Sequence, residues 1–306
     1  MAATASTRSS TETADAGERE RLRKTLWFAP NETLALSTYA KDLFKNYSGI
    51  AEEDIFAHII QVREKAWNVH PYPCIGSFRF LDFAILESPA YQTVVEKLRS
   101  GGKYLDMGCC FAQDLRALAY AGVPSENLYG ADLRPTFIQL SYDLFNDKHK
   151  LRSTFFHGNV FDLSSFRKVS GDQSDPSLFG ELVGKVDIIS ARSFLHVFGA
   201  EDEFRAACQM AQILSSSNGS MIIGRQVGST KPGLNSISLR KSEPVFRHNV
   251  ETWKAFWTRV GEETNTQWDV YSRMIDIAPE VKLSVRQAES RDIEDRAWLE
   301  FVVTRI

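Results

Sequence analysis

The stretch Tyr104-Leu-Asp106-Met-Gly108-Cys-Cys-Phe-Ala112-Gln-Asp114-Leu decides the fold prediction for this chain. It indicates an apolar strand that ends in an acid, a glycine turn, and a helix that begins near Ala112. In a parallel sheet, such a turn lies at the carboxyl edge, where ligands bind. A dinucleotide site needs G-x-G-x-x-G, but only Gly108 is present here. We therefore interpret the turn as a site for a cofactor without phosphates, whose positive charge suits Asp106 and Asp114.

Outward from this turn, predicted strands and helices alternate, which is typical of a parallel sheet with crossover helices. Further strands are predicted at residues 128–132, 153–157, 186–191 and 220–224, and helices at 112–121, from Pro135, at 201–214 and at 250–260. A polar insertion at 170–177 predicts a surface loop. Two last strands at 281–286 and 299–304 stand too close for a parallel crossover, so we expect them to pair antiparallel. The predicted fold is α/β, a Rossmann-like and mostly parallel sheet with an antiparallel C-terminal strand.

The N-terminal third predicts a different kind of structure. Residues 1–20 are polar and rich in Ala, Ser and Thr, which predicts a disordered tail. We expect residues 21–100 to form a helical cap or lid over a core of residues 101–306. In the cap, Asn31 is the expected start of one helix, and a second is expected at 55–66.

Composition excludes several classes of function. The 306 residues are 43% hydrophobic and carry 36 Lys and Arg against 39 Asp and Glu, so no basic surface for nucleic acid is expected. The start of the chain lacks the apolar segment of a secretory signal, and no membrane span is expected. Four cysteines without a CxxC pair indicate reduced thiols in the cytoplasm and no metal site. The sequence is compatible with a homodimer.

Residues at successive strand ends match a cofactor with a sugar and a cationic group, such as S-adenosylmethionine. Asp132 ends the second strand, where an acid has little structural reason to be, so we expect it to bind both ribose hydroxyls. The Asn159 carbonyl is expected to accept from the adenine amino group, and Val160 to flank the ring. The Ala191 carbonyl is a candidate for the methionine ammonium. The remaining predicted contacts are Asp106, Gly108, Cys109, Gln113 and Leu133.

Three segments of the sequence resemble one family closely. They are Pro71-Tyr-Pro-Cys-Ile-Gly76, Leu105-Asp-Met-Gly-Cys-Cys110 with the following Gln113-Asp-Leu-Arg116, and Val123-Pro-Ser-Glu-Asn-Leu-Tyr-Gly130. The chain resembles class I S-adenosylmethionine-dependent methyltransferases, and among them fungal meroterpenoid-pathway enzymes of the austinol and terretonin type. This resemblance implies methyl-ester formation on the carboxyl group of a prenylated aromatic polyketide. The sequence departs from the superfamily pattern where Cys110 and Ala112 replace glycines and Asn159 replaces an acid.

Candidate catalytic residues follow the fourth and fifth strands. His196 is a candidate general base, although packing beside a helix is the favoured interpretation. Arg192 and Arg225 are candidates to bind an acceptor carboxylate, with surface ion pairs as the alternative. A carboxylate acceptor needs no base, because its reference pKa of about 4 leaves it ionised at neutral pH, whereas a phenol with a pKa of about 10 would benefit from one.

Aromatic and basic residues elsewhere are candidate substrate contacts. Tyr72, Phe78 and Arg79 precede the core and are expected either to close over the methyl group or simply to pack between cap and core. Trp253 and Trp257 share one face of the predicted helix at 250–260, where they line either a substrate pocket or the core. We interpret Cys109 and Cys110 as small residues that fill the turn rather than as nucleophiles.

The leading hypothesis is carboxyl O-methylation of an apolar aromatic acid. A phenolic O-methyltransferase is one alternative, and a protein that binds the cofactor while promoting a rearrangement without methyl transfer is another. A nicotinamide oxidoreductase is disfavoured by the missing glycines.

Overall fold

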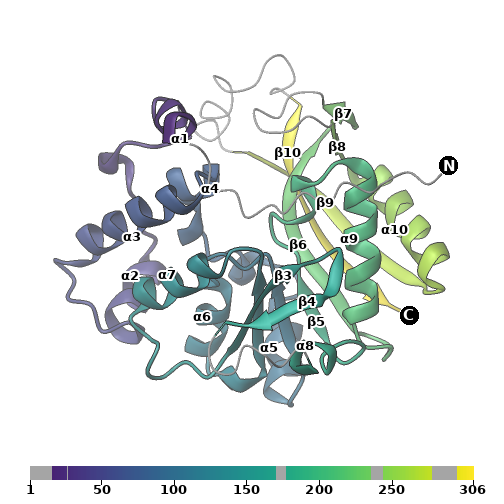
Figure 1. The fold of residues 1–306 in the computed structure, drawn as a ribbon. Helices are drawn as coiled ribbons and strands as arrows, with labels where there is room; N and C mark the ends of the chain where they lie inside the picture. Colours follow the sequence, from purple (N-terminus) through teal and green to yellow (C-terminus); the bar gives the residue numbers. More distant parts are fainter. Residues whose placement is uncertain (1–15, 26, 170–176, 236–243, 278–294) are drawn as a thin grey trace.

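A mixed eight-stranded sheet organises the part of the chain that the computed structural model describes, namely residues 16–25, 27–169, 177–235, 244–277 and 295–306. The strand order is β4-β3-β2-β1-β5-β6-β10-β9 (Figure 1). The strands are β1 (Tyr104–Met107), β2 (Leu128–Asp132), β3 (Thr154–Asn159), β4 (Asp162–Lys168), β5 (Ile188–Ser190), β6 (Met221–Ser229), β9 (Trp268–Asp276) and β10 (Arg296–Arg305). The five strands from β3 to β6 in this order are parallel, whereas β4 and β10 run antiparallel to their neighbours. The predicted fold class is confirmed.

The C-terminal end of the sheet differs from the prediction in its pairing. Strand β10 lies between β6 and β9 and is antiparallel to both. The expected partner strand at 281–286 lies outside the described residues. Strand β9 was not predicted, because its exposed positions include Asp269, Arg273 and Asp276. Edge strand β4 was missed for the same reason. Within the expected loop at 170–177, only Ser177 is described, and it is the first residue of helix α8 (Ser177–Gly180).

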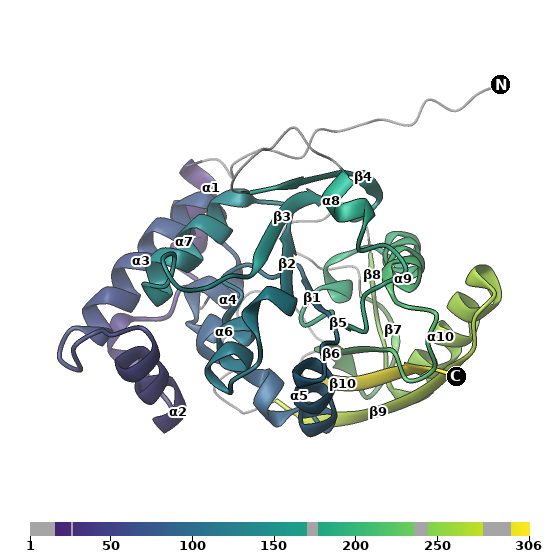
Figure 2. The same ribbon diagram turned by 90° about the horizontal axis from the view of Figure 1, so that it is seen from below.

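Helices cover both faces of the sheet, as Figures 1 and 2 show. One face packs against α5 (Tyr91–Arg99), α6 (Gln113–Tyr120) and α7 (Pro135–Phe145), and the other against α8, α9 (Ala200–Ile213) and α10 (Val250–Thr264). Successive side chains of a strand point to opposite faces. Tyr104 therefore belongs to the first core, and Leu105 and Met107 to the second. Asp106 lies on the face of Tyr104. A small separate sheet pairs β7 (Gly233–Asn235) with β8 (Val245–Arg247).

The N-terminal region consists of short helices, as predicted, with shifted ends. These are α1 (Ala16–Arg23), η1 (Asn31–Thr33), α2 (Thr38–Asp42), η2 (Leu43–Tyr47), α3 (Ile55–Val69), α4 (Pro73–Gly76), η3 (Arg79–Leu81) and η4 (Ala84–Glu87). Residues 16–20 of the predicted tail are helical, which corrects its extent. Asn31 does not cap a long helix, because its side-chain oxygen accepts from the Arg63 guanidinium. Ser37 is the cap instead, and it accepts from the Ala40 N–H at 3.1 Å.

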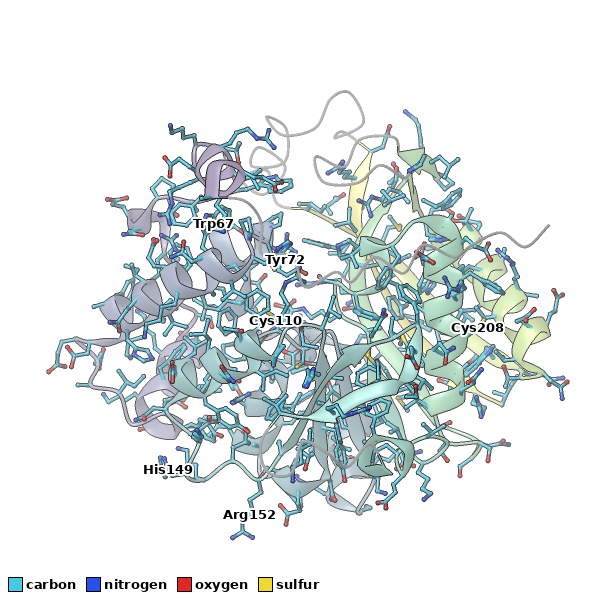
Figure 3. The ribbon with its side chains drawn as sticks, in the orientation of Figure 1. Trp67, Tyr72, Cys110, His149, Arg152 and Cys208 are labelled. Carbon is cyan, nitrogen blue, oxygen red and sulfur yellow. The ribbon has the colours of Figure 1, made fainter. Side chains whose placement is uncertain are left out.

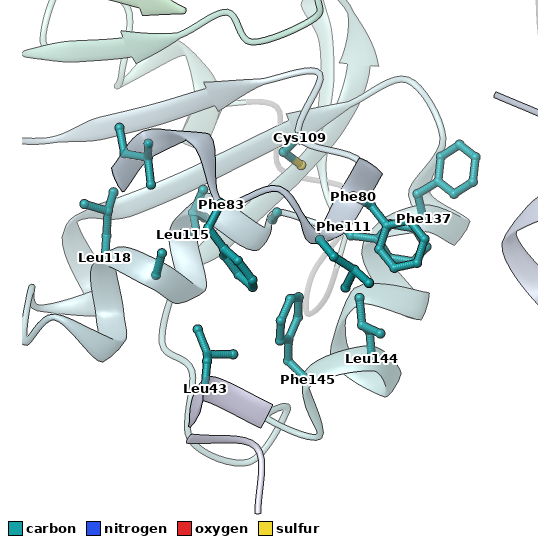
Figure 4. Close-up of a cluster of buried hydrophobic side chains, with 14 of the residues drawn as sticks. Leu43, Phe80, Phe83, Cys109, Phe111, Leu115, Leu118, Phe137, Leu144 and Phe145 are labelled. Carbon is teal, nitrogen blue, oxygen red and sulfur yellow. The ribbon is translucent and has the colours of Figure 1, made fainter. Parts of the chain in front are cut away.

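The cap and the sheet share one hydrophobic core. Buried side chains continue from Leu22 in α1 to Ile223 in β6. Phe80 of the cap lies against Phe111 in the loop after β1, with ring centroids 4.7 Å apart, and Phe111 contacts Phe137 at 6.3 Å (Figure 4). The cap therefore packs directly on the loop that follows β1, and the boundary at residues 100 and 101 stays a prediction. None of the described helices is both long and apolar enough to cross a bilayer.

A buried ion pair joins the two parts near α6. Arg116 and Asp147 are both fully buried, and Arg116 donates to the two carboxylate oxygens at 2.9 and 3.1 Å. The hydroxyl of Tyr47 in the cap donates to the same carboxylate at 2.8 Å. Removing one partner of such a pair leaves the other charge buried without compensation.

We expect Asp147→Ala to lower the free energy of unfolding by about 3–5 kcal/mol in urea denaturation, because it leaves Arg116 unpaired in the core. The matched control is Asp202→Ala, which removes an exposed partner of Arg205 and should change stability by about 1 kcal/mol or less. Equal losses in the two variants would contradict the role given to the buried pair.

Candidate functional site

The turn after β1 has a backbone conformation that favours glycine. Gly108 has a φ of +74°, and a Cβ built on it would lie 2.5 Å from Cδ2 of Phe194. The N–H groups of Gly108 and Cys109 both donate to the Ala131 carbonyl, at 2.7 and 3.0 Å. The turn is therefore hydrogen-bonded to the end of β2, and Phe194 leaves no room for a side chain at Gly108.

The two residues that replace glycines keep the glycine conformation. Cys110 and Ala112 both have a φ of +48°, in the left-handed region that non-glycine residues rarely adopt. The loop therefore keeps a left-handed backbone at both positions while carrying a thiol and a methyl side chain. Burial raises the pKa of the Cys109 and Cys110 thiols well above the usual range, which favours the protonated and unreactive form.

Asp132 at the end of β2 has a structural role that the sequence analysis did not foresee. Its two oxygens accept from the N–H groups of Cys110 at 2.9 Å and Arg134 at 2.8 Å. The carboxylate retains lone pairs for further donors. Burial raises its pKa, while the backbone N–H groups oppose this shift. The next residue, Leu133, is 41% exposed, so an apolar side chain lies open beside the acid.

Two further acids lie at the same edge of the sheet. Asp106 and Asp114 are both buried. Burial, and next the charge of Asp114, raise the pKa of Asp106 to about 7, while a hydrogen bond from Ser190 and the charge of Arg192 lower it. Burial also raises the pKa of Asp114. This pair of carboxylates gives the edge an electrostatic environment that favours a cation.

The other predicted cofactor residues lie at neighbouring strand ends. Asn159 ends β3, and its side-chain oxygen accepts from the Phe161 N–H at 3.0 Å, while Val160 is buried in the same turn. Ala191 follows β5, and its N–H donates to the Ile223 carbonyl. Gln113 begins α6 and is half-buried. The topology therefore places all of these residues along one edge of the sheet.

Three arginines gather beside the acids. Arg192 follows β5, Arg225 lies in β6, and Arg79 begins η3 in the cap. Arg79 and Arg225 both lie over the ring of Trp298, with guanidinium carbons 4.5 and 5.3 Å from its centroid. A small cavity opens here, lined by Ala84, Ile85, Ser88, Asp114, Ser190, Arg192, Ile223, Gly224, Arg225 and Glu300.

The two predicted aromatic contacts from the cap lie in different surroundings. Tyr72 accepts from Arg134 at 2.9 Å and lies beside the cofactor turn, near Cys110 in Figure 3. Phe78 is buried inside the cap, where its ring faces the Arg63 guanidinium at 4.1 Å. Tyr72 thus lies on the cofactor side of the edge, whereas Phe78 packs within the cap.

The burial of Trp253 and Trp257 favours core packing over a substrate pocket, although Trp257 also borders a cavity near Trp268 and Arg305. Both side chains are fully buried in the core between α10 and the sheet. This core covers the face of the sheet opposite to the arginines. Trp253 contacts Phe301 with ring centroids 4.7 Å apart, whereas Glu300, which precedes Phe301 in β10 and points to the other face, lines the cavity. The helical spacing of the tryptophans reflects core packing, which was the alternative interpretation.

His196 lies in η6 (Leu195–Val197), the short helix that follows β5. Its carbonyl accepts from Arg247 at 3.1 Å, and the helix packs against α9, β6 and β8. His196 does not line the cavity that holds Arg192 and Arg225. Its role as a base stays a prediction.

Sequence reasoning missed Trp298, Glu300 and Phe194. Glu300 lines the cavity from β10, and Trp298 of the same strand lies against Arg79 and Arg225. The sequence analysis used this strand only to assign the sheet. Glu300 is directly opposite Arg225 in the register, is buried and pairs with Arg273 at 2.6 Å. An acid inside an otherwise apolar predicted strand could have indicated Glu300, because a buried carboxylate needs a partner.

We expect Gly108→Ala to lower thermal stability and to weaken binding of S-adenosylhomocysteine, because the added methyl group displaces Phe194. The matched control is Gly184→Ala, since Gly184 has a φ of +75° and nothing within 4 Å of the added Cβ. Both variants carry about 1–2 kcal/mol of left-handed backbone strain, so only the clash separates them. Calorimetric titration that shows equal affinity for both variants would contradict this reading of the turn.

Comparisons with known proteins identify relatives of the chain. The family model for the meroterpenoid methyltransferase N-terminal domain matches residues 27–81. The chain is 38% identical to O-methyltransferase phiE of Fungal sp. (strain ATCC 74256), over 77% of this chain and 75% of that protein. It is 37% identical to O-methyltransferase atr3 of Stereocaulon alpinum, over 81% of this chain and 68% of that protein.

Two further matches are a relative whose name states its substrates and a solved structure of low sequence identity. The chain is 35% identical to the Asnovolin E/Chermesin D methyltransferase nvfJ of Aspergillus novofumigatus, over 76% of this chain and 79% of that protein. A solved phosphoethanolamine N-methyltransferase 2 of Haemonchus contortus superposes with a TM-score of 0.49 at 11% identity, over 88% of this chain and 60% of that one. On the identities to the fungal enzymes, which extend over most of both chains, this protein belongs to the fungal meroterpenoid methyltransferase family.

Proposed function

We propose that the protein is an S-adenosylmethionine-dependent O-methyltransferase that methylates the carboxyl group of an apolar aromatic acid. The observation that carries the proposal is the gathering of Arg79, Arg192 and Arg225 beside the acids of the cofactor turn. Guanidinium groups bind carboxylates by charge-assisted hydrogen bonds. One edge of the sheet thus offers negative groups for a cationic cofactor and positive groups for an anionic acceptor.

The residues present fit this cofactor. Asp132 retains acceptor capacity for ribose hydroxyls, Leu133 is open to an adenine ring, and Asp106 would bind the amino-acid ammonium. When bound, S-adenosylmethionine supplies an electrophilic methyl group on a cationic sulfur. The lack of room for a side chain at Gly108 supports close approach of the ligand to the backbone.

The protein's own task is to bind the acceptor, align it and exclude water. Good alignment of two reactants supplies roughly 7–11 kcal/mol of the barrier. A carboxylate with a reference pKa of about 4 is already ionised at neutral pH. One of its oxygens forms the new O–C bond as the S–C bond breaks, the electron pair stays on sulfur, and no proton moves. A general base is therefore not needed.

We expect the purified protein to convert a prenylated hydroxybenzoic acid into its methyl ester. At saturating S-adenosylmethionine, kcat/KM for the acid should be nearly constant between about pH 6 and 8, because the nucleophile is ionised throughout. His196→Asn should keep activity within about threefold, since general-base catalysis contributes about 10²-fold or more where it operates. Mass spectrometry before and after alkaline hydrolysis separates the labile ester from a stable phenol ether. Ether formation, or unmethylated acid despite cofactor binding, would refute carboxyl methylation.

We expect affinity for S-adenosylmethionine to rise about tenfold per pH unit up to about pH 7 and then to level off. The cationic ligand favours the ionised form of Asp106, whose pKa in the ligand-free protein is about 7, so binding at lower pH must release a proton. Stability of the ligand-free protein has the opposite trend. Between pH 3.8 and about 7 this carboxyl is ionised in the unfolded chain but still protonated in the folded protein, so a rise in pH over this range favours unfolding.

Calorimetric titration of Asp106→Asn checks this assignment. We expect the variant to bind more weakly and without the pH dependence, while the control Asp143→Asn, at an exposed position on α7, behaves as the wild type. A variant that keeps the rise in affinity below pH 7 would show that another group is responsible.

A further inference from the structure

The three arginines of the site differ in their counter-charges. Arg192 faces both oxygens of Asp114 at 3.5 Å, lies 3.9 Å from Asp82 and also donates to the Asp82 carbonyl. Arg225 pairs with Glu87 at 3.1 Å and lies opposite Glu300. Within the described part of the chain, no side-chain hydrogen bond or ion pair is formed by Arg79. Among the three arginines, Arg79 is therefore the one without an acidic partner at contact distance in the described residues.

The environment of Arg79 makes this arrangement unfavourable in the ligand-free protein. Its Nε is buried without a hydrogen-bond partner, and the side chain is only partly exposed. Burial, together with the charges of Arg192 and Arg225, lowers the pKa of Arg79, against the opposing effects of Cys74 and Asp82. An arginine with buried and unsatisfied donors destabilises a fold unless a ligand completes its bonds.

Trp298 holds the guanidinium of Arg79 in a defined place. The guanidinium carbon lies 4.5 Å from the ring centroid, within the range of a cation–π contact. This contact uses the flat face of the group, whereas its N–H donors point outward in the plane. Stacking therefore limits the freedom of the side chain while leaving donors for an anion.

Arg79 also lies where cap and core meet. It begins η3 directly after Phe78, which has a φ of +59°, and next to Phe80, which packs on Phe111 of the cofactor turn. The position of its charge is thus tied to the loop that would hold the methyl donor. A group bound by Arg79 lies on the same side of the sheet as that donor.

We propose that Arg79 is the specificity-determining residue that selects acids, by donating to one oxygen of the acceptor carboxylate. This rests on the proposed function, which it deepens by naming the group that recognises the substrate charge. Arg192 and Arg225 already have carboxylate partners within the protein and line the walls of the site. Methylation removes the negative charge of the acceptor, so the neutral ester loses this ion pair and is released.

The test compares a prenylated hydroxybenzoic acid with its carboxamide, which has a similar shape and no charge. We expect the wild-type complex with S-adenosylhomocysteine to bind the acid at least tenfold more tightly in calorimetric titration. Arg79→Gln should weaken binding of the acid about 10- to 100-fold and leave the amide nearly unchanged, as for loss of one charged hydrogen bond. Arg79→Lys should keep part of the preference, because it keeps the charge.

The control is Arg259→Gln, since Arg259 also stacks on an aromatic ring, Phe204 at 3.6 Å, but lies on α10 at the opposite face. It should keep the full preference for the acid. Should Arg79→Gln fail to fold, Arg79→Met preserves packing on Trp298 without the charge and gives the same readout. Equal binding of acid and amide by the wild type, or an undiminished preference in the Gln or Met variant, overturns the assignment.

Measuring ester formation alongside binding distinguishes a failure of this inference from a failure of the proposed function. If the wild type methylates the acid but the Arg79 variants keep their preference, Arg79 is wrongly assigned and the carboxyl reaction stands. If acid binding depends on Arg79 but no ester forms, the carboxyl reaction is wrong while the binding role is supported.

Discussion

The hydrogen bonds between the turn after β1 and the end of β2 are the constraint on which the site depends. The Ala131 carbonyl accepts from Gly108 and Cys109, and Asp132 accepts from Cys110. These bonds hold a left-handed loop that contains two non-glycine residues in unfavourable backbone conformations. Three acids from two strands and one helix are thereby brought to the same edge, and the charge of the site follows from this turn.

The cap completes the site from the other side. Its aromatic residues pack on the cofactor loop through Phe80 and Phe111, and its Arg79 reaches the tryptophan of β10. Carboxylates and guanidinium groups are thus interleaved within one small region, since Arg192 lies 3.5 Å from Asp114 and Arg225 lies 3.1 Å from Glu87. Such pairing stabilises charges in partly buried surroundings, because buried charges are stable only near opposite charges.

Much of the fold and part of the site were predictable from local patterns. The parallel strands, the helices between them and the strand-end residues Asp106, Asp132 and Asn159 follow from apolar runs that end in polar residues. The edge strands β4 and β9 were not predictable in this way, because one side of each is exposed and polar. The aromatic helix at 250–260 shows the limit of periodicity, since Trp253 and Trp257 have the spacing of either a core or a pocket and only the packed structure distinguishes them.

By itself, then, the sequence determined that an α/β sheet presents a non-dinucleotide cofactor turn, because tight turns and strand ends depend on residues that are neighbours in the chain. Only the tertiary structure decided which arginines have counter-ions. Arg79, Arg192, Arg225 and Trp298 come from segments far apart in the chain, and the charges, distances and burial that distinguish them exist only once cap and sheet have packed together.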